Sequence, residues 1–146
     1  MEKYVQDLFE KLGNEMIKYN PYYNKELLQK AFLFAYEAHK WVYRKSKELY
    51  ITHPLHIALH LTQIEADETS IISALLHDVL DNKKITLSQI DKQFWKEVTS
   101  IVQGVTQLGQ LYYTLDMNNK DIENLKQSLV SVGDDIRIFL VKIADR

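Results

Sequence analysis

The spacing of apolar residues constrains this chain more than any other feature, because it is helical over almost the whole length. Near the N-terminus an apolar face repeats every three or four residues and comprises Val5, Leu8, Phe9, Leu12 and Met16. Only four glycines and two prolines occur in 146 residues, which leaves few places for β-hairpins or flexible linkers. The sequence therefore predicts an all-α bundle of about seven to nine helices in a single domain, residues 1–146.

Turn and capping signals divide the chain into these helices. A break is predicted at 20–24, because the residue before a proline disfavours α geometry, and a second helix should follow over 25–43. Pro54 suits the first position of a third helix. A fourth helix over 68–80 is apolar on nearly every side and should be buried, with Asp67 as its cap. Other helical signals are the pair Thr86 and Gln89, which resembles a capping box, the stretch 95–108, a start at Asp121, and a last start at Asp134 or Asp135.

Composition excludes several classes of protein. The formal net charge of -2 gives no electrostatic case for binding nucleic acid or an anionic membrane. The absence of cysteine excludes disulfides, thiolate metal sites and thiol nucleophiles. No apolar run approaches the roughly 20 residues needed to span a bilayer, and the N-terminus does not resemble a signal peptide. We therefore expect a cytoplasmic protein without membrane contact or direct contact with nucleic acid.

A histidine–aspartate pair at the end of the buried fourth helix is the first candidate for chemistry. His77 and Asp78 would point about 100° apart on a straight helix, so both can reach one ion only near a helix end. The dipeptide alone is common, and its ordinary interpretation is a partly buried histidine beside a solvated aspartate. Burying a charged aspartate is costly, however, unless it is paired or bound to metal. His53 and Asp145 are the obvious additional ligands, because a bundle brings distant helices together around one site.

Four stretches of the chain together resemble successive motifs of one known family. They are AHKWVYRKSKELYITHPLHIA at 38–58, ALLHDVLDN at 74–82, IVQGVTQL at 101–108 and DDIRIFLVKIADR at 134–146. In this order they resemble the hydrolase domain of the RelA/SpoT family, an HD-type, manganese-dependent (p)ppGpp 3′-pyrophosphohydrolase. The similarity extends from about Leu27 to Arg146 and implies an HD-domain helical bundle. Because the last predicted helix ends without a cap, we also expect a C-terminally truncated fragment of a longer protein.

The resemblance implies a role for each matching residue. The positions that match metal ligands, with Mn²⁺ as the expected cofactor, are His53, His77, Asp78 and Asp145. The positions that match the family's guanine-binding stretch are Arg44, Lys45 and Ser46. A planar guanidinium suits contact with an aromatic base, although without the resemblance Arg44 and Lys45 would be read as solvated loop charges.

The family follows its HD pair with an acidic Glu-Asp dyad, thought to position and deprotonate the attacking water, and this chain departs from it. Asp81 keeps a carboxylate but shortens it, and a displacement of about 1 Å at a reacting centre can cost on the order of 100-fold in rate. Asn82 replaces the second carboxylate with an amide, which can hold a water but cannot accept its proton. We predict Asp81 as the general base and Asn82 as the residue that orients the water.

The predicted activity is hydrolysis of the 3′-diphosphate of ppGpp or pppGpp to GDP or GTP and pyrophosphate. The first alternative is a catalytically decayed nucleotide-binding module that regulates a synthetase domain downstream. Asn82 favours this alternative, whereas the intact ligand set opposes it, because a buried aspartate without its ion is destabilising. A second alternative is an HD phosphohydrolase for another nucleotide, against which the Arg-Lys-Ser stretch argues through the resemblance.

Overall fold

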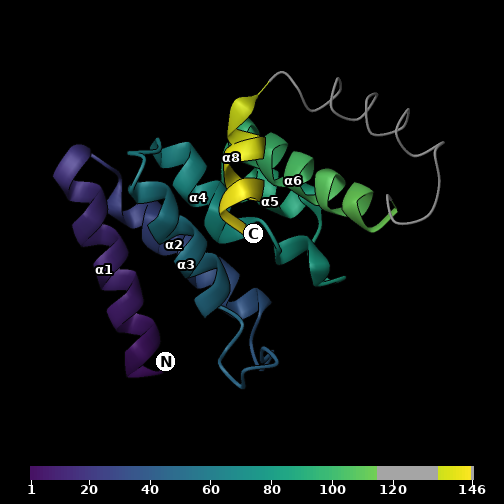
Figure 1. Cartoon of the computed structure of the whole chain (residues 1–146), viewed down its shortest axis with the longest axis horizontal. Helices are drawn as coiled ribbons and strands as arrows, with labels where there is room; N and C mark the ends of the chain where they lie inside the picture. The colour runs from purple at the N-terminus through teal and green to yellow at the C-terminus, as the bar shows by residue number, and fades with distance from the viewer. Residues whose placement is uncertain (115–134, 146) are drawn as a thin grey trace.

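The computed structural model describes residues 1–114 and 135–145, with side chains up to residue 110 in the first range. Within these residues the chain forms seven α-helices and one short 3₁₀ helix, η1 (Figure 1). Their bounds are α1 Lys3–Tyr19, α2 Lys25–Ala38, α3 Thr52–Thr62, α4 Glu68–Leu76, η1 Val79–Asp81, α5 Leu87–Gln93, α6 Lys96–Thr114 and α8 Ile136–Asp145. The predicted all-α class is confirmed. The predicted helix start at Asp121 and the alternative start at Asp134 lie outside the described residues.

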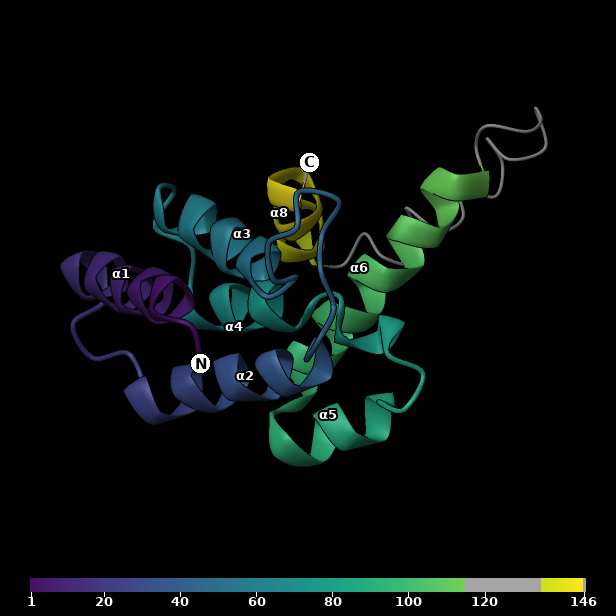
Figure 2. The ribbon, with the colours of Figure 1, turned by 90° about the horizontal axis from the view of Figure 1, so that it is seen from below.

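Helix α4 occupies the centre of the fold. It contacts α2, α3, α6 and α8, and Figure 2 shows it between α3 on one side and α2 on the other. Every residue from Ser70 to Leu76 is buried, as the apolar sequence predicted. Full burial of a leucine or isoleucine side chain contributes about 1.5–3 kcal/mol, so this short helix anchors the core.

The predicted caps begin their helices. The Asp67 side chain accepts a hydrogen bond from the Ser70 backbone N–H at the start of α4. Thr86 and Gln89 form a reciprocal capping box at the start of α5. Asp135 immediately precedes α8, and its carboxylate accepts the backbone N–H two residues further on. These short polar side chains satisfy N–H groups that a helix leaves unpaired, which fixes where each helix begins.

Helix α2 is shorter than predicted, because it ends at Ala38 rather than at residue 43. Trp41 takes a left-handed backbone conformation with φ of 65°, which a continuing helix cannot accommodate. The chain then folds back on itself, and the Tyr50 N–H donates to the Val42 carbonyl at 2.8 Å. The connection predicted to be irregular therefore contains a hairpin-like loop, residues 42–50.

Helix α4 also ends earlier than predicted, at Leu76 instead of residue 80. Asp78 has φ of −103° and ψ of 1°, outside α geometry, and η1 follows directly. Two other boundaries differ by a few residues: α3 begins at Thr52, before Pro54, and α6 continues beyond residue 108. Among the described residues, no helix is both long enough and apolar enough to cross a membrane.

Candidate metal centre

Four side chains from three separate parts of the chain converge at one point. His53 lies in the first turn of α3, His77 caps the end of α4, Asp78 precedes η1, and Asp145 ends α8. His53 Nε2 is 2.9 Å from Asp145 Oδ1, and His77 Nε2 is 3.0 Å from Asp78 Oδ2. The crossed distances, from His53 to Asp78 and from His77 to Asp145, are both 3.6 Å. The break at the end of α4 turns His77 and Asp78 towards one point, which a straight helix would not do.

The geometry of His77 fits a metal ligand. Its Nδ1 lies 2.7 Å from the Ala74 carbonyl oxygen, so the proton on Nδ1 is held there and Nε2 is left to bind an ion. Nε2 is buried and has no hydrogen bond of acceptable geometry among the described residues, although Asp78 Oδ2 is close. The nitrogen and the carboxylate oxygens therefore face a common space rather than one another. Imidazole and carboxylate are the ligands that a cysteine-free site offers to divalent ions.

The electrostatics of the cluster favour a positive charge at its centre. Burial lowers the pKa of His77, but the contacts with Asp145 and Asp78 outweigh burial and raise this pKa to about 10. His53 and His77 hold the pKa of Asp145 well below its usual range. Burial alone would raise the pKa of Asp78, but its contact with His77 outweighs burial and lowers it. Two ionised carboxylates around a buried imidazole are stabilised by a cation, which can be a proton or a metal ion.

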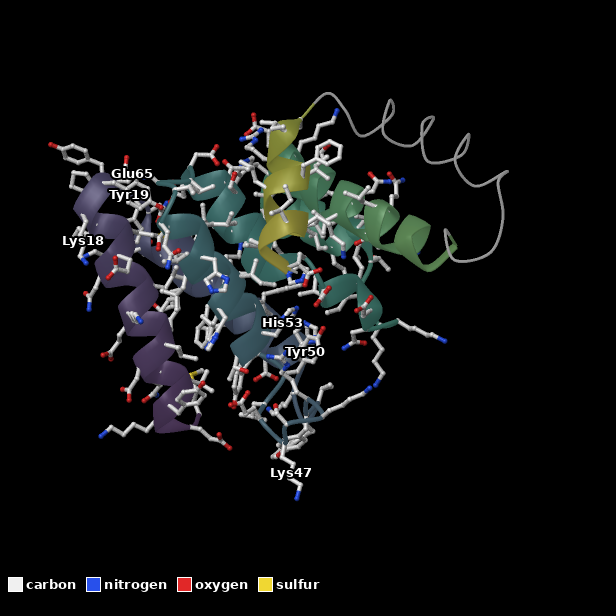
Figure 3. All side chains as sticks on the ribbon, viewed as in Figure 1. Lys18, Tyr19, Lys47, Tyr50, His53 and Glu65 are labelled. Carbon is white, nitrogen blue, oxygen red and sulfur yellow. The ribbon has the colours of Figure 1, made fainter. Side chains whose placement is uncertain are left out.

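Tyr50 and His39 support the cluster from one side. The Tyr50 hydroxyl donates to Asp78 Oδ2 at 2.6 Å, and its ring lies beside His53 (Figure 3). The His39 ring contacts the Tyr50 ring, with 4.7 Å between centroids. His39 is buried, and burial lowers its pKa to about 4, so this imidazole is neutral near pH 7. The Tyr50 hydroxyl thus holds the Asp78 carboxylate in place, and the neutral His39 ring packs against the Tyr50 ring.

A cavity of about 300 Å³ opens beside the cluster. The four candidate ligands line it together with Tyr50, Asp81 and Lys142. Burial raises the pKa of Asp81, and the nearby Asp78 carboxylate raises it further. A larger groove, of about 650 Å³ beside α2, contains none of the candidate ligands and is mostly apolar. We place the chemistry in the smaller cavity, because the convergent donor atoms are found there.

The structure does not bring Asn82 into this cavity. The Asn82 side-chain amide donates to the Ala38 carbonyl at 2.9 Å, and its oxygen accepts the Lys84 backbone N–H at 3.0 Å. The residue lines the larger groove beside α2 instead. Its amide therefore connects the segment after η1 to the end of α2, and these contacts lend no support to the predicted water-orienting role.

The guanine-binding stretch predicted from the resemblance lies in the loop 42–50. Arg44, Lys45 and Ser46 are exposed and do not line the cavity, and the Ser46 hydroxyl donates to Glu48 Oε2 at 3.3 Å. The loop is nevertheless joined to the cavity, because Tyr50 at its end is part of the cavity wall. Figure 3 shows Lys47 at the loop tip, away from Tyr50 and His53.

Two cavity residues that contact the candidate ligands directly, Tyr50 and Lys142, were not identified from the sequence. Tyr50 precedes His53 by three residues, and Lys142 precedes Asp145 by three residues on α8. Residues three apart lie on the same side of a helix, so the spacing before Asp145 was an available signal for Lys142. Tyr50 lies before the first turn of α3, where spacing gives no such signal.

The helical fold and the paired histidine and aspartate side chains are the features of an HD-type candidate metal site. Residues 31–146 match the HD domain family, and the chain belongs to this family.

The chain is also similar to larger bacterial proteins. It is 38% identical over 132 residues to GTP pyrophosphokinase rsh of Brucella melitensis. The matched residues are 88% of this chain and 17% of that protein. It is 35% identical over 139 residues, or 95% of this chain and 20% of each relative, to two proteins of Escherichia coli. These are the bifunctional (p)ppGpp synthase/hydrolase SpoT of strain K12 and the guanosine-3′,5′-bis(diphosphate) 3′-pyrophosphohydrolase of O157:H7. The chain thus spans a fifth or less of these relatives, and its resemblance to the RelA/SpoT family is confirmed.

Proposed function

We propose that the protein is a metal-dependent hydrolase that removes the 3′-diphosphate of ppGpp or pppGpp as pyrophosphate, leaving GDP or GTP. The convergence of His53, His77, Asp78 and Asp145 beside a polar cavity carries the proposal. The names of the two Escherichia coli relatives, which include this hydrolase activity, support the choice of substrate.

These four side chains would hold one divalent ion, and we propose Mn²⁺ from the resemblance. Imidazole nitrogen and carboxylate oxygen suit several divalent metals, so the donor set supports a metal more strongly than it supports manganese. When bound, the ion polarises a phosphate oxygen and lowers the pKa of a water molecule.

Asp81 is the proposed general base. It lines the cavity beside the ligands, and its pKa is raised by burial and by Asp78, which brings its proton affinity closer to that useful at neutral pH. Asp81 would accept a proton from water as the water oxygen bonds to phosphorus. The bond between that phosphorus and the ribose 3′ oxygen breaks, the 3′ oxygen takes up a proton from solvent, and Asp81 returns its proton to solvent.

The loop 42–50 is the proposed site for the nucleoside half of the substrate. Arg44, Lys45 and Ser46 are exposed there and can contact a guanine base, with the Arg44 guanidinium stacking on it. Support comes from Tyr50, which ends the loop and lines the cavity, so the loop adjoins the cavity. For Asn82 we now propose a supporting role, in which its bond to Ala38 holds the segment that carries Asp81.

A nucleotide-binding regulatory module is the second candidate function. The observation that favours it is that Asn82 supplies no second carboxylate and its amide is already occupied by backbone groups. Three expectations from the sequence stay predictions. They are that the protein continues beyond this single domain, that a synthetase domain lies downstream, and that the location is cytoplasmic.

The test is pyrophosphate release from ppGpp by the purified protein, with and without Mn²⁺. We expect Mn²⁺-dependent turnover that Asp81→Asn lowers by about 10²–10⁴-fold, the usual range for a general base. Asp91→Asn, which changes an exposed aspartate of α5, is the matched control and should keep full activity. Tight binding of ppGpp without turnover would favour the regulatory module, and neither binding nor turnover would overturn both functions.

A further inference from the structure

Lys142 is the one lysine or arginine that lines the metal-site cavity within the part of the chain that the structure describes. It lies on α8, one helical turn before Asp145, and its Nζ is 2.8 Å from Asp145 Oδ2. Its side chain is 23% exposed, so the ammonium is largely enclosed but open to the cavity. Lysines that serve only solubility are exposed, so the enclosed position of Lys142 indicates a specific role.

The two oxygens of Asp145 face different groups. Oδ1 lies towards the candidate metal centre, 2.9 Å from His53 Nε2 and 3.6 Å from His77 Nε2. Oδ2 contacts the Lys142 ammonium. The cation is therefore one carboxylate away from the metal ligands and faces the same cavity. Opposite it, α6 presents Gly109, where even a Cβ atom would come within 3.5 Å of Lys142 Nζ.

The charge of the cavity requires such a cation. Asp78, Asp81 and Asp145 all line the cavity, and a divalent ion would neutralise two of their three charges when all are ionised. A diphosphate entering next to a remaining carboxylate would be repelled without a further positive group. Lys142 is the cation available there among the described residues.

We propose that Lys142 binds the diphosphate group of the substrate and of the released pyrophosphate. A lysine ammonium has three donors, so it can keep its bond to Asp145 Oδ2 and donate to a phosphate oxygen at the same time. This inference rests on the proposed function and deepens it, because it assigns the residue that selects a phosphate-chain ligand at this site. The contact makes Lys142 a substrate-binding residue rather than one that only holds Asp145.

The test is calorimetric binding of inorganic pyrophosphate to the Mn²⁺-loaded protein. Lys142→Met removes the charge at similar length, and we expect it to weaken pyrophosphate binding by about 10–100-fold, the range for a charge-assisted hydrogen bond. Mn²⁺ affinity without pyrophosphate should stay within about threefold, and Lys142→Arg should retain most pyrophosphate affinity because it keeps the charge. Lys18→Met is the matched control, since Lys18 makes an i,i+3 ion pair of the same 2.8 Å length on α1, away from the cavity (Figure 3).

Two results would overturn the inference. One is unchanged pyrophosphate affinity in Lys142→Met, and the other is an equal loss of Mn²⁺ and pyrophosphate affinity, which would mean that the lysine acts only through Asp145. Should Lys142→Met fail to fold, Lys142→Gln measured in the same way decides between these outcomes. Because pyrophosphate binding needs no turnover, a failure of ppGpp hydrolysis leaves this test readable, and hydrolysis by the wild type can succeed where the Lys142 inference fails.

Discussion

Three of the four candidate ligands are held by an atom that is not itself a candidate ligand. The Ala74 carbonyl fixes His77, the Tyr50 hydroxyl fixes Asp78, and the Lys142 ammonium fixes Asp145. The Ala74 contact sets the tautomer of His77 and the Tyr50 contact orients Asp78, and loss of such a partner commonly lowers metal affinity by about 10–100-fold. At the scale of single residues, the site therefore extends beyond the histidines and aspartates that its motif displays.

A substitution at Asn82 tests whether this residue has a structural or a catalytic role. In Asn82→Asp the Nδ2 donor is lost and a carboxylate oxygen faces the Ala38 carbonyl. We expect the free energy of unfolding to fall by about 1–3 kcal/mol, because the Ala38 carbonyl loses its donor in this part-buried contact, with no gain in turnover. Urea unfolding and pyrophosphate release measure the two effects, with Asn14→Asp, at an exposed position of α1, as the control. Unchanged stability together with a clear rise in turnover would contradict the structural role.

His39 makes stability depend on pH in a defined window. Burial lowers its pKa from 6.5 to about 4, with Asp78 opposing this shift in part. Between these values the unfolded chain binds a proton that the folded chain does not, so stability is fully present above pH 6.5 and is lost as the pH falls towards 4. The contribution lost between pH 7 and pH 5 is about 2 kcal/mol.

The variant His39→Gln removes this proton uptake. Its unfolding free energy should decrease less than that of the wild type between pH 7 and pH 5, by about the same 2 kcal/mol. Chemical denaturation at the two pH values measures the difference, and His60→Gln, at an exposed histidine of α3, should not show it. Parallel pH profiles for wild type and His39→Gln would show that His39 is not the group responsible.

At the scale of helices, the close contact between α6 and α8 positions the end of the chain that carries Asp145. A Cβ atom added at Gly104 would overlap Ile138 Cδ1 and would come within 3.0 Å of Ile138 Cγ1. Ile138 is buried, so it has little room to move. Gly104 thus weakens α6 by its own conformational freedom but allows α8 to pack closely against it.

Gly104→Ala should destabilise the protein by about 1–3 kcal/mol through overpacking, despite the gain in helix propensity. Ile138→Val, which lacks the Cδ1 atom, should reduce the effect in a double-mutant cycle. The control on the same helix is Gly109→Ala, where the new Cβ would make only an ordinary contact at 3.5 Å, and there we expect stabilisation by about 0.5–1 kcal/mol. Thermal unfolding measures all of these, and stabilisation by Gly104→Ala would contradict the close contact.

Helix starts could be predicted from the sequence, whereas two helix ends could not. Asp67 and Thr86 begin helices through local hydrogen bonds, which depend on residues only three positions apart. The ends of α2 and α4 depend on contacts between distant segments, such as the bond from Asn82 to Ala38. The ligand set could be proposed because its residues match the family pattern. Tyr50 could not, because its role depends on a contact with Asp78, which is 28 residues away in the sequence.

At the scale of the whole molecule, the candidate metal centre joins segments that are far apart in the sequence. Its candidate ligands come from α3, the end of α4 and the end of α8, and His53 and Asp145 are 92 residues apart. An ion bound only by the folded chain would therefore stabilise all three helices together. The relatives are about five times longer than this chain or more, so the helical unit described above is one part of such proteins.

The most direct test of the metal centre is thermal unfolding of the protein as Mn²⁺ is added. At a concentration 100 times the dissociation constant, binding contributes about 2.7 kcal/mol, which corresponds to a rise in Tm of roughly 5–10 °C. We predict this rise for the wild type and for the exposed-site control His60→Gln, and its loss in His77→Ala and Asp145→Ala. No rise in the wild type, or an equal rise in His77→Ala, would contradict a metal centre at these four residues.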